Sequence, residues 1–213
     1  ILALHEVGSN NPDGVEIKKR KDVHGHPLDG IPFHPYYTVK DIVGVVVFLM
    51  VFSIIVFFAP EGGGYFLEYN NFLPADPLKT PLHIAPVWYF TPYYSLLRAM
   101  VWPLFGIDAK FWGVVAMGAG VVILAFLPWL DRSPVKSIRY RGPIFKTLLT
   151  IFVISFVILG FLGTQPPSYA FFGVIPSAPV AQVLSAYYFL YFLTMPWWSK
   201  IDKYKPEPDR VTM

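Results

Sequence analysis

Five histidines and a small set of carboxylates are the side chains that could carry proton or metal chemistry in this sequence. The histidines are His5, His24, His26, His34 and His83. Cysteine is absent, so the sequence offers no ligand for an iron–sulfur cluster and no thiolate for zinc or haem. The pair of histidines at 24 and 26 could suggest a metal site, but a polar loop explains the pair better, and we expect no metal ligand there.

Two ionisable groups lie at positions where apolar stretches end or begin. His5 follows the apolar start of the chain, and Gly8 with Asn10 or Asn11 then provides a helix stop. Asp41, preceded by Lys40, opens a long apolar run. Taken singly, Asp41 could simply stabilise a helix N-terminus and Lys40 could reach to a membrane surface. Taken together, they are ionisable groups at an apolar boundary, where functional residues are often found.

The composition indicates the kind of element that must position these residues. Apolar residues make up 54% of the 213 residues and charged residues only 15%, whereas soluble domains contain about 25% charged residues. This much apolar surface excludes a disordered chain. The lack of cysteine excludes a small secreted domain held by disulfides. The composition therefore predicts a protein embedded in lipid.

Four apolar runs come close to the roughly 20 residues that a membrane-spanning helix requires. None of the four contains Asp, Glu, Lys, Arg or His. A fifth run, 87–104, contains Arg98 and two prolines, so we expect one or two short interfacial or re-entrant helices there. The predicted fold class is an all-α integral membrane protein with four transmembrane helices plus short interfacial helices in a long periplasmic loop. The four predicted transmembrane helices are 42–59, 111–130, 147–163 and 179–198.

The positions of the basic residues predict the orientation. Segments 1–41, 131–146 and 199–213 hold five, five and four of the 17 Lys and Arg residues. Because Lys and Arg concentrate on the cytoplasmic side of membranes, we expect these three segments to be cytoplasmic and the loops 60–110 and 164–178 to be periplasmic. We interpret 1–41 as the end of a truncated helix followed by a cytoplasmic segment, and 199–213 as a cytoplasmic tail.

The loop 60–110 is unusually long and contains most of the remaining candidate residues. Connections of more than about 12–15 residues are uncommon and often functional. This loop is rich in proline and aromatic residues, and it contains the run Pro86-Val87-Trp88-Tyr89-Phe90 followed by Tyr94 and by Leu97-Arg98. We expect it to fold onto the membrane surface and to be functional. A passive surface cap is the alternative.

Four motifs in order along the chain resemble cytochrome b of quinol–cytochrome c oxidoreductases. They are Gly8-Ser9-Asn10-Asn11-Pro12, the stretch from Tyr36 to Asp41, Pro86 to Phe90 with Leu97-Arg98, and Pro128-Trp129-Leu130-Asp131-Arg132-Ser133-Pro134. The resemblance covers essentially the whole chain and corresponds to the C-terminal part of that family, from the end of the fourth helix through helices five to eight. It implies electron transport in a respiratory chain, coupled to proton translocation.

The resemblance implies parts of two quinone sites. At the inner, quinone-reduction site, His5 and Asp41 match the residues expected to deliver protons, and the matching pocket residues are Ser9, Phe33, Tyr37 and Lys40. At the outer, quinol-oxidation site, the family uses Pro-Glu-Trp-Tyr, and Val87 replaces the glutamate. The expected outer pocket consists of Pro86, Val87, Trp88, Tyr89, Phe90 and Tyr94.

The substitution at Val87 leaves the outer proton acceptor open, because valine cannot accept a proton. Asp108 or a bridging water chain is the hypothesis for that role, and we expect His83 to have a positioning role. The stretch 98–110 matches the family's docking surface for the iron–sulfur protein.

The resemblance also implies cofactors, partners and a location. Two b-type haems are expected in the complex, ligated by an N-terminal half that precedes Ile1 in the family. The other expected partners are the iron–sulfur protein, a cytochrome c-type subunit, a second copy of the complex and membrane lipids, with no nucleic acid. The expected location is the bacterial inner membrane, with both ends of this segment cytoplasmic. A non-catalytic membrane scaffold subunit and a transporter fragment are the alternatives.

Overall fold

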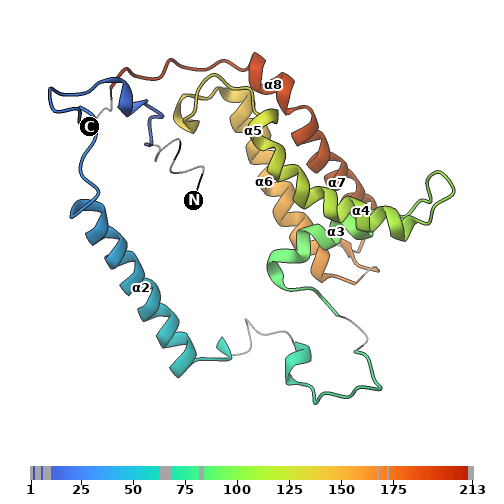
Figure 1. Ribbon diagram of the computed structural model, residues 1–213. Helices are drawn as coiled ribbons and strands as arrows, with labels where there is room; N and C mark the ends of the chain where they lie inside the picture. Colours follow the sequence, from blue (N-terminus) through green and yellow to red (C-terminus); the bar gives the residue numbers. More distant parts are fainter. Residues whose placement is uncertain are drawn as a thin grey trace. The chain divides into compact units, whose positions relative to one another are not determined.

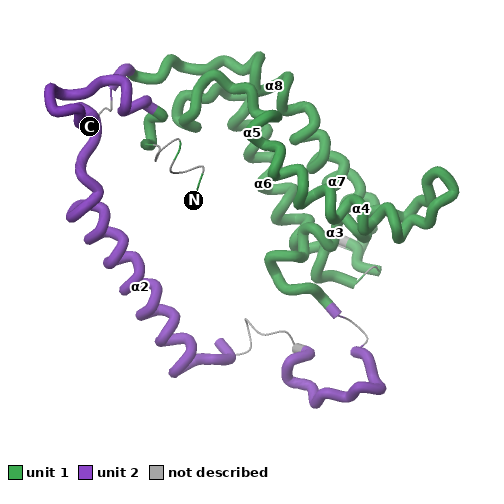
Figure 2. Tube along the Cα trace, viewed as in Figure 1, with its two compact units in different colours: residues 1–14, 85–208 green, residues 15–84, 209–213 purple. Residues whose placement is uncertain are grey.

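A computed structural model describes residues 2, 6, 11–62, 69–81, 84–166, 168–171 and 173–210. The chain divides into two compact units, coloured separately in Figure 2. Unit 1 comprises Ile1–Gly14 and Ala85–Pro208, and unit 2 comprises Val15–Ile84 and Asp209–Met213.

Unit 2 contains one long helix, α2 (Tyr36–Phe58), and two short 3₁₀ helices, η1 (Ile17–Lys19) and η3 (Tyr69–Phe72) (Figure 1). Helix α2 forms because its 23 residues contain no proline, and it ends just before Pro60. It starts six residues before the predicted 42–59 span. The rule that a span should be uncharged excluded Lys40 and Asp41, but a helix can begin in the polar boundary before the apolar run.

Unit 1 is a helical bundle. Its elements are η4 (Trp88–Phe90), α3 (Thr91–Ala99), α4 (Ala109–Val122), η5 (Ile123–Phe126), α5 (Leu127–Leu130), η6 (Ile138–Tyr140), α6 (Pro143–Thr164), β1 (Ala170–Phe171), β2 (Ile175–Pro176), α7 (Ser177–Leu193) and α8 (Met195–Ile201). Helix α3 packs against α4, α6 and α7 (Figure 1). The strands β1 and β2 form a small antiparallel hairpin in the loop between α6 and α7 that the sequence did not predict.

Within the described residues, three helical stretches are long and apolar enough to cross a membrane: Tyr36–Phe58, Ala109–Leu130 and Pro143–Thr164. A fourth would be the pair α7 and α8, which is bent by 62°. The bend lies where Pro196 enters the first turn of α8, and proline cannot donate the hydrogen bond that would continue α7. The chain is therefore mostly helical, with three or four candidate spans, as an all-α membrane protein requires.

The core of unit 1 forms where α3, α6 and α7 meet. Leu96, Leu159 and Tyr188 are almost completely buried there. The Tyr188 hydroxyl donates to the Gly120 carbonyl at 2.7 Å, and the Ser95 hydroxyl donates to the Leu159 carbonyl at 2.5 Å. These hydroxyls are satisfied, as buried polar groups must be in an apolar environment.

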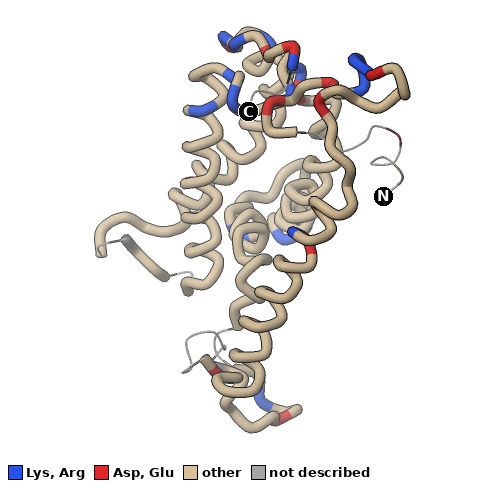
Figure 3. The backbone as a smooth tube through the Cα atoms, turned by 90° about the vertical axis from the view of Figure 1, so that its left-hand side faces the viewer, with Lys and Arg blue, Asp and Glu red and all other residues tan. Residues whose placement is uncertain are grey.

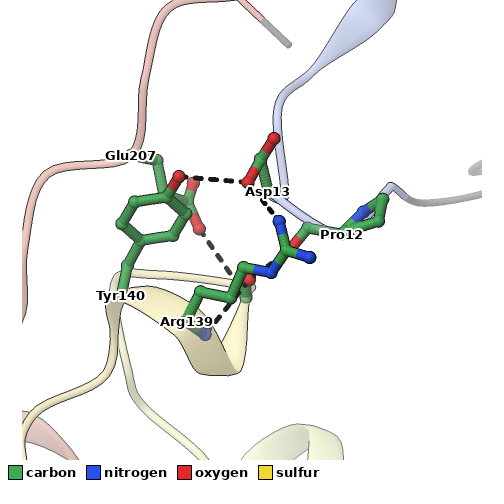
Figure 4. Close-up of polar contacts among 6 residues, drawn as sticks. Pro12, Asp13, Arg139, Tyr140 and Glu207 are labelled. Carbon is green, nitrogen blue, oxygen red and sulfur yellow. Dashed lines mark hydrogen bonds and ion pairs between the residues drawn. The ribbon is translucent and has the colours of Figure 1, made fainter. Parts of the chain in front are cut away.

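Polar contacts gather three segments of unit 1 at one end of the bundle. Figure 4 shows the buried Asp13 carboxylate accepting from the Arg139 guanidinium and from the Tyr140 hydroxyl, both at 3.1 Å. The Glu207 carboxylate accepts from two backbone N–H groups of the 131–140 loop. Asp202 caps α6 by accepting from the N–H groups of Ile144 and Phe145 at 3.1 and 3.2 Å. Figure 3 shows that Lys and Arg residues lie mainly near helix ends and in loops.

Candidate functional site

The aromatic run at 86–90 forms a projecting turn at the start of α3. Val87 begins the 3₁₀ turn, and its carbonyl accepts from the Phe90 N–H at 2.8 Å. The Thr91 hydroxyl donates to the Trp88 carbonyl at 2.8 Å and closes the same turn. The exposed fractions of Val87, Trp88 and Tyr89 are 51%, 82% and 62%. The turn therefore presents an apolar and aromatic surface, while its backbone is fixed from within.

The helix behind this turn is held in place by close glycine contacts. Thr91, Pro92, Ser95, Leu96 and Ala99 of α3 are buried. Gly163 of α6 lies so close to the Thr91 carbonyl that an added Cβ would clash with backbone, and Gly113 of α4 is similarly close to the Leu97 carbonyl. Because these neighbours are backbone atoms, they cannot move aside as a flexible side chain would. The position of the aromatic turn is thus determined by α4 and α6.

Arg98 fixes the far end of α3. Its Nη1 donates to the Gln165 carbonyl at 2.7 Å, and its guanidinium lies 5.6 Å from the centre of the Tyr94 ring. This cation–π contact orients one of the six predicted outer-pocket residues. A cavity of about 260 Å³ lies beside it, lined by Ser95, Arg98, Val101, Leu162, Ser177, Ala178 and Ala181.

Asp108, the hypothetical outer proton acceptor, is the N-cap of α4. Its exposed carboxylate accepts from the Lys110 N–H at 3.1 Å. A carboxylate at this position stabilises the helix N-terminus by itself. The cap is a sufficient structural reason for the residue, so a role in proton transfer stays a prediction. His83 lies outside the described residues.

Part of the predicted inner pocket is assembled at the start of α2. The rings of Phe33 and Tyr37 stack with centroids 6.2 Å apart, and the Lys40 Nζ lies 5.1 Å from the Tyr37 ring centre. These three residues and Asp41 are exposed in unit 2. His5 and Ser9 lie outside the described residues, so the predicted pairing of His5 with Asp41 stays a prediction.

A larger cavity, which the sequence did not reveal, lies near the polar end of unit 1. Its volume is about 650 Å³. At its rim, Arg141 Nη2 and Asp131 Oδ2 form an ion pair at 2.7 Å. The two residues are ten positions apart in a loop, and no spacing rule for helices or strands would pair them.

Metal or haem ligation finds no support in the described residues. They contain no group of three or more His, Asp or Glu that could hold a metal ion. The described histidines, at 24, 26 and 34, precede α2 and lie in none of the candidate spans. A haem within a bundle needs axial ligands from inside it, and the described residues place no histidine inside a candidate span. The haems that the resemblance implies are expected to be held by the N-terminal half of the family's proteins.

The apolar helices and the exposed aromatic turn define an all-α membrane protein. Residues 74–189 match the family model described as Cytochrome b(C-terminal)/b6/petD. The chain is 57% identical to the cytochrome b of Allochromatium vinosum over all of this chain and 50% of that protein. It is 44% identical to the cytochrome b of Rhodospirillum rubrum over 99% of this chain and 46% of that protein.

A third relative, the cytochrome b/c1 of Bradyrhizobium diazoefficiens, is 39% identical over all of this chain and 28% of that protein. These similarities show that the chain belongs to the cytochrome b family and corresponds to its C-terminal portion. The chain spans about half the length of the curated cytochrome b relatives named above. The resemblance stated from the sequence motifs is thereby confirmed.

Proposed function

We propose that the chain contributes the C-terminal part of a bacterial quinol–cytochrome c oxidoreductase and forms parts of an outer quinol-oxidation site and an inner quinone-reduction site. The single observation that supports this best is the aromatic turn at 86–90. Its Trp88 and Tyr89 side chains are exposed although its backbone is held rigidly by buried α3. A surface of exposed aromatic rings on a fixed support suits the flat, apolar head of a quinol.

In the proposed outer site, Phe90 and Tyr94 hold the ring and the protein must supply a proton acceptor. Val87 cannot do so, and the remaining proposal is Asp108 or a water chain. Loss of two electrons from a quinol releases two protons, so the site needs a group or a water chain that accepts them. The haems that would take up an electron would be held by the N-terminal half of cytochrome b, and the iron–sulfur protein would take up the other.

In the proposed inner site, a quinone that gains two electrons takes up two protons. Asp41 and His5 would deliver them, and Lys40 and Tyr37 would lie beside the ring. The stacked pair Phe33 and Tyr37 supports this proposal, because it already provides an aromatic face next to Asp41. On this proposal the charged segments face the cytoplasm, as the Lys and Arg distribution indicates.

The outer site is tested by replacing Phe90 with alanine in the membrane-bound complex. We expect Phe90→Ala to lower quinol–cytochrome c reductase activity about tenfold, because an aromatic contact contributes up to about 1.5 kcal/mol. Phe72→Ala is the matched control, since Phe72 is also aromatic, is 50% exposed in the same 60–110 loop and lies outside both the proposed pocket and the 98–110 stretch. Equal activities of the two variants would refute the proposed outer pocket.

The role of Asp108 is tested by two substitutions that separate its two functions. Asparagine caps a helix about as well as aspartate but does not accept a proton at neutral pH. If Asp108 is the acceptor, Asp108→Asn loses quinol oxidation while the complex keeps its thermal stability. Asp108→Ala would lose both. Full activity in Asp108→Asn would eliminate Asp108 and leave the water chain.

The inner site is tested with the outer site blocked by an inhibitor. We expect Asp41→Asn to slow inner-site quinone reduction by about a hundredfold, the usual effect of removing a general acid. Asp22→Asn is the control, because Asp22 lies in the same unit but outside the proposed pocket, where it accepts from the His24 and His26 backbone and pairs with the His26 ring. An unchanged rate in Asp41→Asn would refute the proposed proton donor.

A further inference from the structure

The cavity near the polar end of unit 1 has a charged rim and an apolar interior. The apolar lining comes from η5, α5, α6, α7 and α8. The rim comes from the 131–141 loop. Phe145, Leu149 and Phe152 follow one another at intervals of four and three residues, so they line the cavity from one face of α6. Seven residues of helix correspond to a depth of roughly 10 Å.

The rim is positively charged overall. Two basic residues, Arg141 and Lys136, and one acidic residue, Asp131, line the cavity. The Arg141 side chain is only 12% exposed, its guanidinium lies 4.4 Å from the centre of the Phe145 ring, and its Nη2 pairs with Asp131. A guanidinium carries five N–H donors. Arg141 is therefore held in place by two neighbours and has donors left for an anion.

We infer that this cavity binds one anionic phospholipid, with the phosphate at Arg141 and Lys136 and part of an acyl chain along Leu149 and Phe152. An apolar depth that opens at a basic rim matches an amphiphile with a negative head. Basic pockets between the ends of membrane-spanning helices bind the head groups of anionic lipids. The volume of about 650 Å³ falls within the range of ligand sites in proteins.

A quinone is the other membrane molecule that this volume could admit. Its head is uncharged and gains little from a rim with a net positive charge. A phosphate, in contrast, accepts two parallel hydrogen bonds from a guanidinium, which is the strongest arrangement available to Arg141. The charge of the rim thus favours the phospholipid.

The head-group contact is tested by measuring lipids that remain bound to the purified complex. The complex is isolated in mild detergent, incubated with phosphatidylglycerol or with zwitterionic phosphatidylcholine, and analysed by native mass spectrometry. We expect Arg141→Gln to lower phosphatidylglycerol retention about tenfold, as expected for a lost charge-assisted hydrogen bond. Arg141→Lys, which keeps the charge but not the two parallel donors, should retain an intermediate amount.

The control for charge is Lys146→Gln, which removes an exposed cation from α6 outside the cavity lining. The acyl-chain contact is tested by Leu149→Trp, which fills the cavity without changing the charge, against Val153→Trp at an exposed position of the same helix. Leu149→Trp should lose the lipid and Val153→Trp should retain it.

Three retention results would overturn the inference. These are equal retention in Arg141→Gln and Lys146→Gln, full retention in Leu149→Trp, and equal retention of phosphatidylcholine and phosphatidylglycerol by the unmodified complex. Recovery of a quinone in place of the phospholipid would also overturn it.

Discussion

Helices α3 and α2 show two ways in which a helix of this protein is positioned. Helix α3 has nine residues, of which five are buried against α4, α6 and α7. Helix α2 has 23 residues and buries none of them within unit 2. The short helix is fixed by contacts inside the chain, whereas the long one presents apolar side chains all round. A helix that is apolar on every face belongs in lipid or against further protein.

This comparison bears directly on the two proposed quinone sites. The outer aromatic turn continues into α3, and its position is therefore fixed by the packing of α3 against α4, α6 and α7. The inner residues Tyr37, Lys40 and Asp41 lie on the first turns of α2, so their final position depends on what surrounds that helix in the membrane. We expect substitutions in the bundle to disturb the outer site and substitutions along α2 beyond its first turns to be tolerated.

The largest difference is expected between leucines of the two helices. Leu96 of α3 is 1% exposed and Leu49 of α2 is 50% exposed. We expect Leu96→Ala to destabilise the complex by about 2–5 kcal/mol, because it leaves a cavity in a packed core. Leu49→Ala should cost far less. Thermal unfolding of the purified complex measures both, and equal losses would show that α2 is as tightly packed in the membrane as α3.

A second test of the packing of the two helices adds volume where the leucine substitutions remove it, by replacing a glycine with alanine. Gly163→Ala places a methyl group against the Thr91 carbonyl, whereas the Cβ of Gly44→Ala in α2 meets nothing within 4 Å. Overpacking costs about 1–3 kcal/mol, and removal of glycine from an unobstructed helix gains up to about 1 kcal/mol. We therefore expect opposite signs in the melting temperature. A stable Gly163→Ala complex would contradict the tight contact behind the aromatic turn.

Much of the bundle could be predicted from the apolar runs alone, because a membrane imposes helix length and excludes charge. The predicted spans 111–130 and 147–163 lie inside the helical stretches Ala109–Leu130 and Pro143–Thr164. The break between α7 and α8 was missed, although Pro196 within the predicted span 179–198 is a signal that could have indicated it.

The candidate site was predictable to a lesser degree. The aromatic run was identified by its resemblance to a family, and its exposed side chains and buried support were visible only in the fold. The basic rim of the large cavity depends on the 131–141 loop, which folds back so that Arg141 contacts Asp131. Loop contacts of this kind follow from tertiary packing and leave no periodic pattern in the sequence.

A smaller difference in stability is expected between serine substitutions in α3 and α2. The buried Ser95 of α3 donates its hydroxyl proton to the Leu159 carbonyl of α6. We expect Ser95→Ala to cost about 1 kcal/mol, the usual value of one hydrogen bond. Ser53→Ala in α2 is the matched control and should change the melting temperature less. Equal melting temperatures of the two variants would contradict the prediction.

The smallest effect concerns the polar end of unit 1. Burial raises the pKa of the Tyr140 phenol, and the hydrogen bond with Asp13 and the charge of that carboxylate raise it further. Because the folded state holds this proton more tightly, stability is complete below pH about 10, the pKa of a free tyrosine, and declines as the pH rises above it. Tyr140→Phe should flatten that decline in unfolding measured from pH 8 to 11. An unchanged slope would exclude Tyr140 as the titrating group.

The bend after α7 has a consequence for the surrounding bilayer. Seventeen residues of helix rise only about 25 Å, while the hydrocarbon layer of a membrane is about 30 Å thick. If α7 crosses this layer, the bilayer must become locally thinner around it or the side chains of α8 must fill the remaining depth. This mismatch would make the protein sensitive to lipid chain length, with shorter chains favouring the bent pair.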